Sequence, residues 1–173
     1  MKDTSGPQRA IELALAAEKR SLETYLRLAW ETPETAGKNM YLRLAMDEFE
    51  HMRLLERQHD RLCSDGTCVP VDIEPSLVER VVPRLERGEG GKNPGSDSGR
   101  SAALLDALEA ENRARGFYRE QAEDSPPGPA RDMFARLAEM EQAHADLLQA
   151  ELDNLAGTGM WLGIREFTLE AER

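Results

Sequence analysis

The sequence is poor in aromatic residues and cysteine, and it has no long apolar run. Aromatic residues make up 5% of 173 positions, and Cys63 and Cys68 are the two cysteines. Two thiols cannot build a four-thiolate zinc or iron site, which leaves a local disulfide or two free thiols. No stretch approaches the length of about 18 apolar residues that spans a membrane, and the first residues lack the apolar region of a signal peptide. We therefore expect a cytoplasmic protein that does not enter a membrane.

Basic residues are the minority among the charges. There are 22 Lys and Arg against 33 Asp and Glu, which gives a formal net charge of −11. No basic stripe is present, so nucleic acid is not expected as a partner. The abundance of Ala, Leu, Glu and Arg is typical of an all-α protein with solvated outer faces. The length suits one domain, residues 1–173.

Glycine and proline mark where helices are expected to begin and end. They predict four long helices at about 7–31, 33–62, 101–124 and 129–156. Residues 63–100 are expected to form a long crossover, with a short helix possible over 75–87 and a mobile stretch at 88–95. Residues 157–173 form a short tail. Two helical hairpins joined by a long crossover are one way of wiring a four-helix bundle.

The sequence repeats itself at a separation of 93 positions without a gap. The matched pairs with ionisable side chains are Glu18 and Glu111, Tyr25 and Tyr118, Glu48 and Glu141, and His51 and His144. Apolar neighbours and the turns between the helices match as well. Each half is therefore predicted to be one helical hairpin, and the two hairpins should be related by a pseudo-twofold axis.

In each predicted helix a glutamate lies in the middle of the apolar stripe that faces the bundle interior. Burying an unpaired carboxylate costs several kcal/mol, so four clustered glutamates require a cation. Four carboxylates and two neutral imidazoles balance two divalent metals. One Glu from each of two helices and Glu-x-x-His from each of the other two is the ligand set of di-iron and di-manganese bundles. The predicted metal-binding and catalytic residues are Glu18, Glu48, His51, Glu111, Glu141 and His144.

Iron or manganese suits these oxygen and nitrogen ligands, and zinc can bind such a set in vitro. The third histidine, His59, also follows a glutamate by three positions, but it lies about 80° around the helix from His51 and Glu48. Nothing in the repeat mirrors it, so it is interpreted as a surface or rim histidine. Tyr25 and Tyr118 either fill space or donate hydrogen bonds to ligating carboxylates across the bundle.

Together, Glu18-x6-Tyr25, Glu48-x-x-His51, Glu111-x6-Tyr118 and Glu141-x-x-His144 resemble the rubrerythrin branch of the ferritin-like superfamily, over about residues 8–156. The resemblance implies a centre of two iron ions that reacts with hydrogen peroxide or dioxygen. It also implies a homodimer or larger homo-oligomer that receives electrons from a small redox protein.

Two departures from that family stand out. The four cysteines of a rubredoxin domain are missing, so electrons are expected from an external donor such as a rubredoxin-type protein. Rubrerythrins also carry an additional Glu one turn after the third-helix ligand, where this sequence has Ala114. Glu109 lies on the wrong side of the helix to replace it. The second departure bears on peroxidase activity rather than on the metal site.

Four functions are compatible with these residues. The favoured one is an oxidoreductase that reduces peroxide or activates dioxygen. The alternatives are a ferritin-like ferroxidase, a hydroxylase acting on an organic substrate, and a bundle whose metals are structural. The tail containing Trp161 either docks on a partner or covers the bundle's own end. Arg115, which replaces Leu22 on the apolar stripe, either offsets buried negative charge or extends outward.

Overall fold

The computed structural model describes residues 5–85 and 98–168, and all regular structure in these ranges is helical. The long helices are α1 (Ser5–Glu31), α2 (Thr35–Asp65), α4 (Ser98–Asp124) and α5 (Pro129–Thr158). A short helix, α3 (Leu77–Val81), and two 3₁₀ turns (Val82–Arg84 and Arg165–Phe167) complete the set. The all-α prediction is confirmed.

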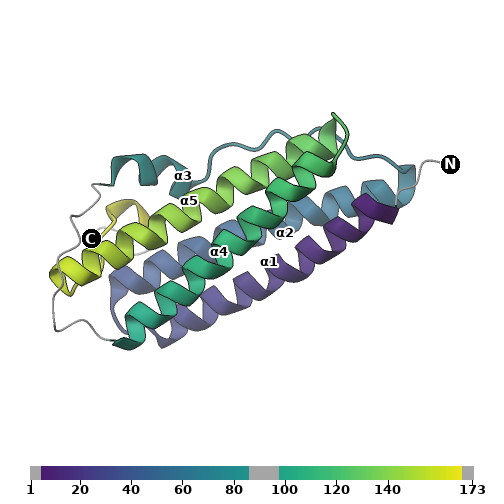
Figure 1. Cartoon of the computed structure of the whole chain (residues 1–173). Coiled ribbons are helices and arrows are strands. Elements are labelled where there is room, and N and C mark those ends of the chain that lie inside the picture. Colours follow the sequence, from purple (N-terminus) through teal and green to yellow (C-terminus); the bar gives the residue numbers. More distant parts are fainter. Residues whose placement is uncertain (1–4, 86–97, 169–173) are drawn as a thin grey trace.

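The four long helices form two antiparallel hairpins that pack side by side (Figure 1). Helix α1 packs along α2, and α4 packs along α5. The hairpins end in matching ways: α2 stops at Gly66 with φ 68°, and α5 stops at Gly159 with φ 73°. Both glycines adopt the left-handed conformation that only glycine adopts freely. The repeat seen in the sequence is therefore also a repeat of helix ends.

These glycines place the ends of α2 and α5 beyond the expected positions 62 and 156. The turns inside the hairpins also correspond. The hydroxyl of Thr32 donates to the carbonyl of Leu28, and that of Ser125 donates to the carbonyl of Gln121, both at 2.7 Å. Each carbonyl also accepts the backbone N–H of the same residue, at 3.0 Å for Thr32 and 3.1 Å for Ser125, so each hydroxyl adds a second hydrogen bond at its helix end.

The apolar core is divided into two layers. One lies around Tyr25, Tyr41 and Leu148, and the other lies around Ile11, Tyr118 and Phe134. Between the layers, in the middle of the bundle, the buried side chains are acidic or imidazole groups. The polar centre is thus closed at both ends by packed hydrocarbon.

The crossover contains the short helix expected within 75–87, although it is shorter than that range. Ser76 and Glu79 form a reciprocal capping box at its start. The Glu79 carboxylate also accepts a 2.8 Å hydrogen bond from Arg136 of α5, which fastens the crossover to the second hairpin. The stretch 88–95, expected to be mobile, lies outside the described residues.

The C-terminal tail covers one end of its own bundle. The Phe167 side chain is buried, and the Trp161 ring packs against Gly37 at the start of α2. A Cβ atom on residue 37 would come within 2.5 Å of that ring, so a larger side chain would displace it. In the described ranges no helix has the length and apolarity needed to cross a membrane.

Candidate metal centre

Four helices deliver six acidic and imidazole side chains to the middle of the bundle. Glu18 comes from α1 and Glu111 from α4, while α2 and α5 each supply a Glu and a His three residues apart, on one helix face. All six residues are at most 2% exposed: Glu18, Glu48, His51, Glu111, Glu141 and His144. The structure brings together every residue that the sequence predicts as a ligand.

The six side chains form two overlapping groups that could each hold a metal ion. The first group is Glu18, Glu48, His51 and Glu141, and the second is Glu48, Glu111, Glu141 and His144. Within each group, one ligand atom per residue lies within 4.8 Å of the others. Glu48 and Glu141 are common to both groups, so their carboxylates lie between the two candidate metal positions.

The two imidazoles present Nδ1 to the carboxylates. Nδ1 of His51 lies 3.2 Å from Glu141 and 3.4 Å from Glu48 and from Glu18. Nδ1 of His144 lies 3.2 Å from Glu48 and 3.3 Å from Glu141. The two rings stack with centroids 5.4 Å apart.

Many of these buried atoms have no hydrogen-bond partner. They include Oε2 of Glu18, Oε1 of Glu48, both carboxylate oxygens of Glu141, and Nδ1 of both histidines. The distances between the imidazole nitrogens and the carboxylate oxygens are short, but the angles between these groups do not suit hydrogen bonds. Orphaned buried polar atoms are costly, and here they converge on common points. A divalent cation at each point would satisfy them, so the residues fit a two-metal site.

Burial and the repulsion between carboxylates strongly shift the pKa values of these side chains. Burial and the Glu141 charge raise the pKa of Glu48 well above its ordinary value, and they raise that of Glu111 to about 8. Burial alone would lower the pKa of His51 and His144, but the surrounding carboxylates outweigh it and raise both. Without a cation the cluster therefore retains protons, and metal ions must compete with them.

Asp47 is a functional candidate that sequence reasoning missed. Its Oδ2 lies 3.4 Å from Nε2 of His144, on the side of the ring opposite the metal-facing Nδ1. Burial alone would raise the pKa of Asp47, but the His144 contact lowers it, so the carboxylate stays charged. The repeat places Met140 opposite Asp47, and Nε2 of His51 has no partner. The signal available in the sequence was an acidic residue, Asp47, at a position where the other half of the repeat has the apolar Met140.

Two tyrosines connect α1 and α4 across the site. The Tyr25 hydroxyl donates to Glu111, and the Tyr118 hydroxyl donates to Glu18. Burial and the nearby carboxylates raise the pKa of both phenols well above the ordinary value. Both therefore remain protonated donors, which hold these two carboxylates in fixed orientations.

Other residues singled out by the sequence lie elsewhere. His59 contacts Glu12 at 3.6 Å and belongs to neither group. Arg115 extends to Gln142 of α5 rather than to the carboxylates, and Glu109 pairs with Arg113 at the surface. Cys63 and Cys68 are both free thiols.

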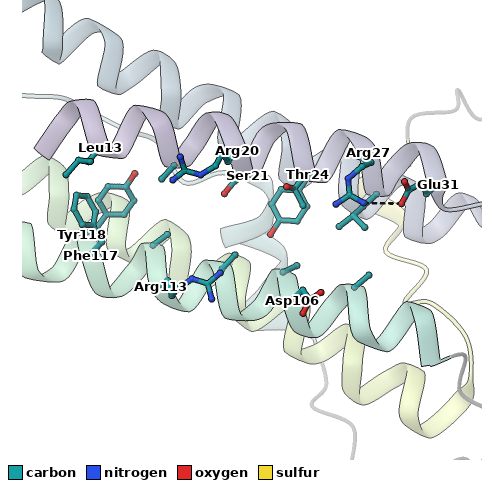
Figure 2. A pocket seen from close by; sticks show the side chains of 17 residues that line it. Leu13, Arg20, Ser21, Thr24, Arg27, Glu31, Asp106, Arg113, Phe117 and Tyr118 are labelled. Carbon is teal, nitrogen blue, oxygen red and sulfur yellow. Dashed lines mark hydrogen bonds and ion pairs between the residues drawn. The ribbon is translucent and has the colours of Figure 1, made fainter. Parts of the chain in front are cut away.

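A groove of about 720 Å³ runs between α1 and α4 (Figure 2). Its walls carry small side chains, including Ala17, Ser21 and Ala114, so the two helices leave space between them. Tyr25 and Tyr118 line it, and these are the residues that contact Glu111 and Glu18. The groove therefore reaches the side chains next to the candidate metal positions. Sequence periodicity could not reveal it.

Comparison with known families identifies the second hairpin directly. Residues 102–170 match the family model described as Rubrerythrin, and the internal repeat relates the first hairpin to this region. Residues 102–170 are therefore similar to rubrerythrins, and the all-α bundle is consistent with a ferritin-like fold. No curated protein and no solved structure was found to match it. The match to the Rubrerythrin family and the buried Glu and His cluster together indicate metal binding.

Proposed function

We propose that this chain is a di-iron carboxylate oxidoreductase that reduces hydrogen peroxide or activates dioxygen. The observation that carries the proposal is the pair of four-residue groups sharing Glu48 and Glu141, with orphaned oxygen and nitrogen atoms. Oxygen and imidazole ligands suit iron, with manganese or zinc as in vitro substitutes. Two iron ions would supply electrons and open coordination positions for a small oxidant.

The residues around the site would have distinct tasks. Glu48 and Glu141 would contribute to both metal positions. Glu18 and His51 would complete one position, and Glu111 and His144 would complete the other. The tyrosine hydroxyls would hold the terminal carboxylates in place. Apolar layers above and below would exclude bulk water.

The groove between α1 and α4 supports an approach of the oxidant from that side. It is lined by both tyrosines and by Ala114, the position at which rubrerythrins carry an additional Glu. Electrons would come from an external donor such as a rubredoxin-type protein, and we expect a homodimer or larger homo-oligomer.

The decisive experiment begins with anaerobic purification and measurement of metals per chain. Peroxide and dioxygen are then added separately to the ferrous protein while its absorption spectrum is recorded. Two irons per chain that oxidise much faster with peroxide support a peroxidase. Uptake of further iron with dioxygen would favour a ferroxidase, and bound metal that never cycles would contradict the proposal.

The groove also favours a second candidate, a hydroxylase acting on an organic substrate. Its volume lies within the range of about 300–1,000 Å³ typical of small-molecule pockets, far more than peroxide needs. Native mass spectrometry of the purified protein tests this candidate. Ala110 also lines the groove. A retained organic molecule that the groove-filling variant Ala110→Trp displaces would support a hydroxylase. An empty groove together with peroxide turnover would exclude it.

A further inference from the structure

A chain of aromatic rings leads away from the candidate metal centre. The Tyr25 hydroxyl donates to Glu111, and its ring stacks on Tyr41 with centroids 6.2 Å apart and an interplanar angle of 26°. Tyr41 in turn meets the edge of Trp161 at 5.7 Å and 76°. Tyr25 and Tyr41 are buried, whereas Trp161 is partly exposed in the tail. Three oxidisable rings thus connect the centre with the protein surface.

The other half of the repeat provides an internal comparison. Tyr118 stacks on Phe134 at 6.2 Å and 24°, almost the geometry of Tyr25 on Tyr41. The repeat places Phe134 opposite Tyr41 and Cys68 opposite Trp161. Phenylalanine fills this position without a hydroxyl, so packing alone does not require the phenol of Tyr41. A benzene ring is also far harder to oxidise than a phenol, so the second branch is interrupted.

The outer ring is held in a built position. Gly37 leaves the space that the Trp161 ring occupies. The next residue, Leu162, donates its backbone N–H to the buried carboxyl group of Glu151 at 2.7 Å. The space at Gly37 and the Leu162 hydrogen bond to Glu151 therefore hold Trp161 next to Tyr41.

We propose that Trp161, Tyr41 and Tyr25 form a route for single electrons between the tail surface and the candidate metal centre. The proposal rests on the proposed function, because it requires a centre that peroxide or dioxygen oxidises. Tyr25 gives one electron to the oxidised centre and its phenolic proton to Glu111. Tyr41 then returns an electron to Tyr25, which recovers its proton from Glu111, and Trp161 returns an electron to Tyr41. A reduced iron–sulfur protein supplies the electron that restores Trp161, so one electron reaches the centre and no proton is consumed along the route.

The ring-to-ring transfer can be tested without iron. The protein is loaded with zinc, which has no redox chemistry in proteins, and carries Trp30→Phe so that Trp161 is the single tryptophan. The substitution is needed because Trp30 is 89% exposed. Azide radicals generated by pulse radiolysis oxidise Trp161, and absorption then reports tryptophan and tyrosine radicals separately.

We expect the tryptophan radical to decay as the tyrosine radical forms, by electron transfer through the same rings in the reverse direction, at a rate independent of protein concentration. Tyr41→Phe should slow this transfer by more than an order of magnitude, and Phe134 shows that the fold accepts that ring. Gly37→Ala should slow it as well, because it displaces Trp161 and leaves every oxidisable residue in place. Phe134→Leu, on the interrupted branch, should leave the rate unchanged.

Absence of a tyrosine radical in the parent protein would overturn the proposal, and so would an unchanged rate in Tyr41→Phe. Zinc content, measured on the same samples, reports on the metal site by itself. A chain that binds no metal but still transfers the electron would contradict the proposed function and would support only the transfer between the rings.

Discussion

The carboxyl group of Glu151 occupies in the second hairpin the position that the amide of Gln58 occupies in the first. Gln58 accepts from the backbone N–H of Val69 and donates to its carbonyl, both at 3.0 Å. Glu151 accepts from the N–H of Leu162 at 2.7 Å, while its second oxygen has no partner. Both side chains are buried and fasten the segment that follows a left-handed glycine. One anchor is neutral at every pH, and the other can ionise.

The first prediction follows from that difference. Burial raises the pKa of Glu151 from the ordinary value of 4.5 to about 8, despite the Leu162 N–H. A raised folded-state pKa gives stability that is fully present below about 4.5 and is lost as pH rises through about 8. The free energy of unfolding of Glu151→Gln should equal that of the wild type near pH 4.5. Near pH 8 it should exceed the wild-type value by a few kcal/mol. Urea unfolding of both proteins across this pH range measures the difference.

The matched control is Gln58→Glu, which should introduce the same loss of stability with rising pH into the first hairpin. Comparing variants with the wild type at each pH removes the contribution of the metal-site groups that titrate in the same range. A Glu151→Gln difference that stays constant with pH would contradict the protonated anchor.

The second prediction concerns the shared carboxylates. Glu48→Ala or Glu141→Ala should remove at least one of two metals per chain, because each side chain belongs to both candidate groups. His59→Ala should leave the metal content unchanged, since that residue lies in neither group. Elemental analysis of the purified variants provides the measurement. Two metals retained by both glutamate variants would refute the ligand assignment.

The third prediction concerns the inequality of the two histidines. Asp47 faces Nε2 of His144, whereas the described structure offers His51 no such carboxylate. An outer carboxylate orients a ligating imidazole. Asp47→Asn should therefore lower the affinity for one metal by about 10–100-fold and leave the affinity for the other unchanged. Competitive chelator titration resolves the two affinities. Equal weakening of both metals would show that Asp47 acts on the bundle as a whole.

The fourth prediction concerns proton release. The raised pKa values of Glu48, His51 and His144, with that of Glu111 at about 8, leave protons on the metal-free cluster at neutral pH. Metal binding should therefore release protons, and affinity should increase as pH rises toward about 8. Calorimetry in buffers of different ionisation enthalpy counts the protons. Binding without proton release would indicate that the cluster is already ionised.

Much of this architecture could be predicted from the sequence because its main signals are periodic. Glutamates on apolar stripes and a gapless repeat were sufficient for the all-α bundle and for the residues that meet at its centre. Contacts made by non-periodic residues were not accessible in the same way. Gly37 lies in the first turn of α2, and its contact with Trp161 depends on how the tail folds back. The groove depends on the spacing of α1 and α4, which small side chains permit but do not dictate.

The matching helix ends at Gly66 and Gly159 show that the two hairpins keep one common plan, yet the residues around the centre have diverged in pairs. A symmetric assembly of identical hairpins would carry every substitution twice, so neither end could change alone. Joining the hairpins in one chain removes that constraint. The repeat can then match a phenol with a benzene ring (Tyr41 and Phe134) and an acid with an amide (Glu151 and Gln58). It can also match a carboxylate with a thioether (Asp47 and Met140). The two ends of the bundle thereby differ: one carries the contacting rings of Tyr25, Tyr41 and Trp161, and the other carries Tyr118 stacked on Phe134.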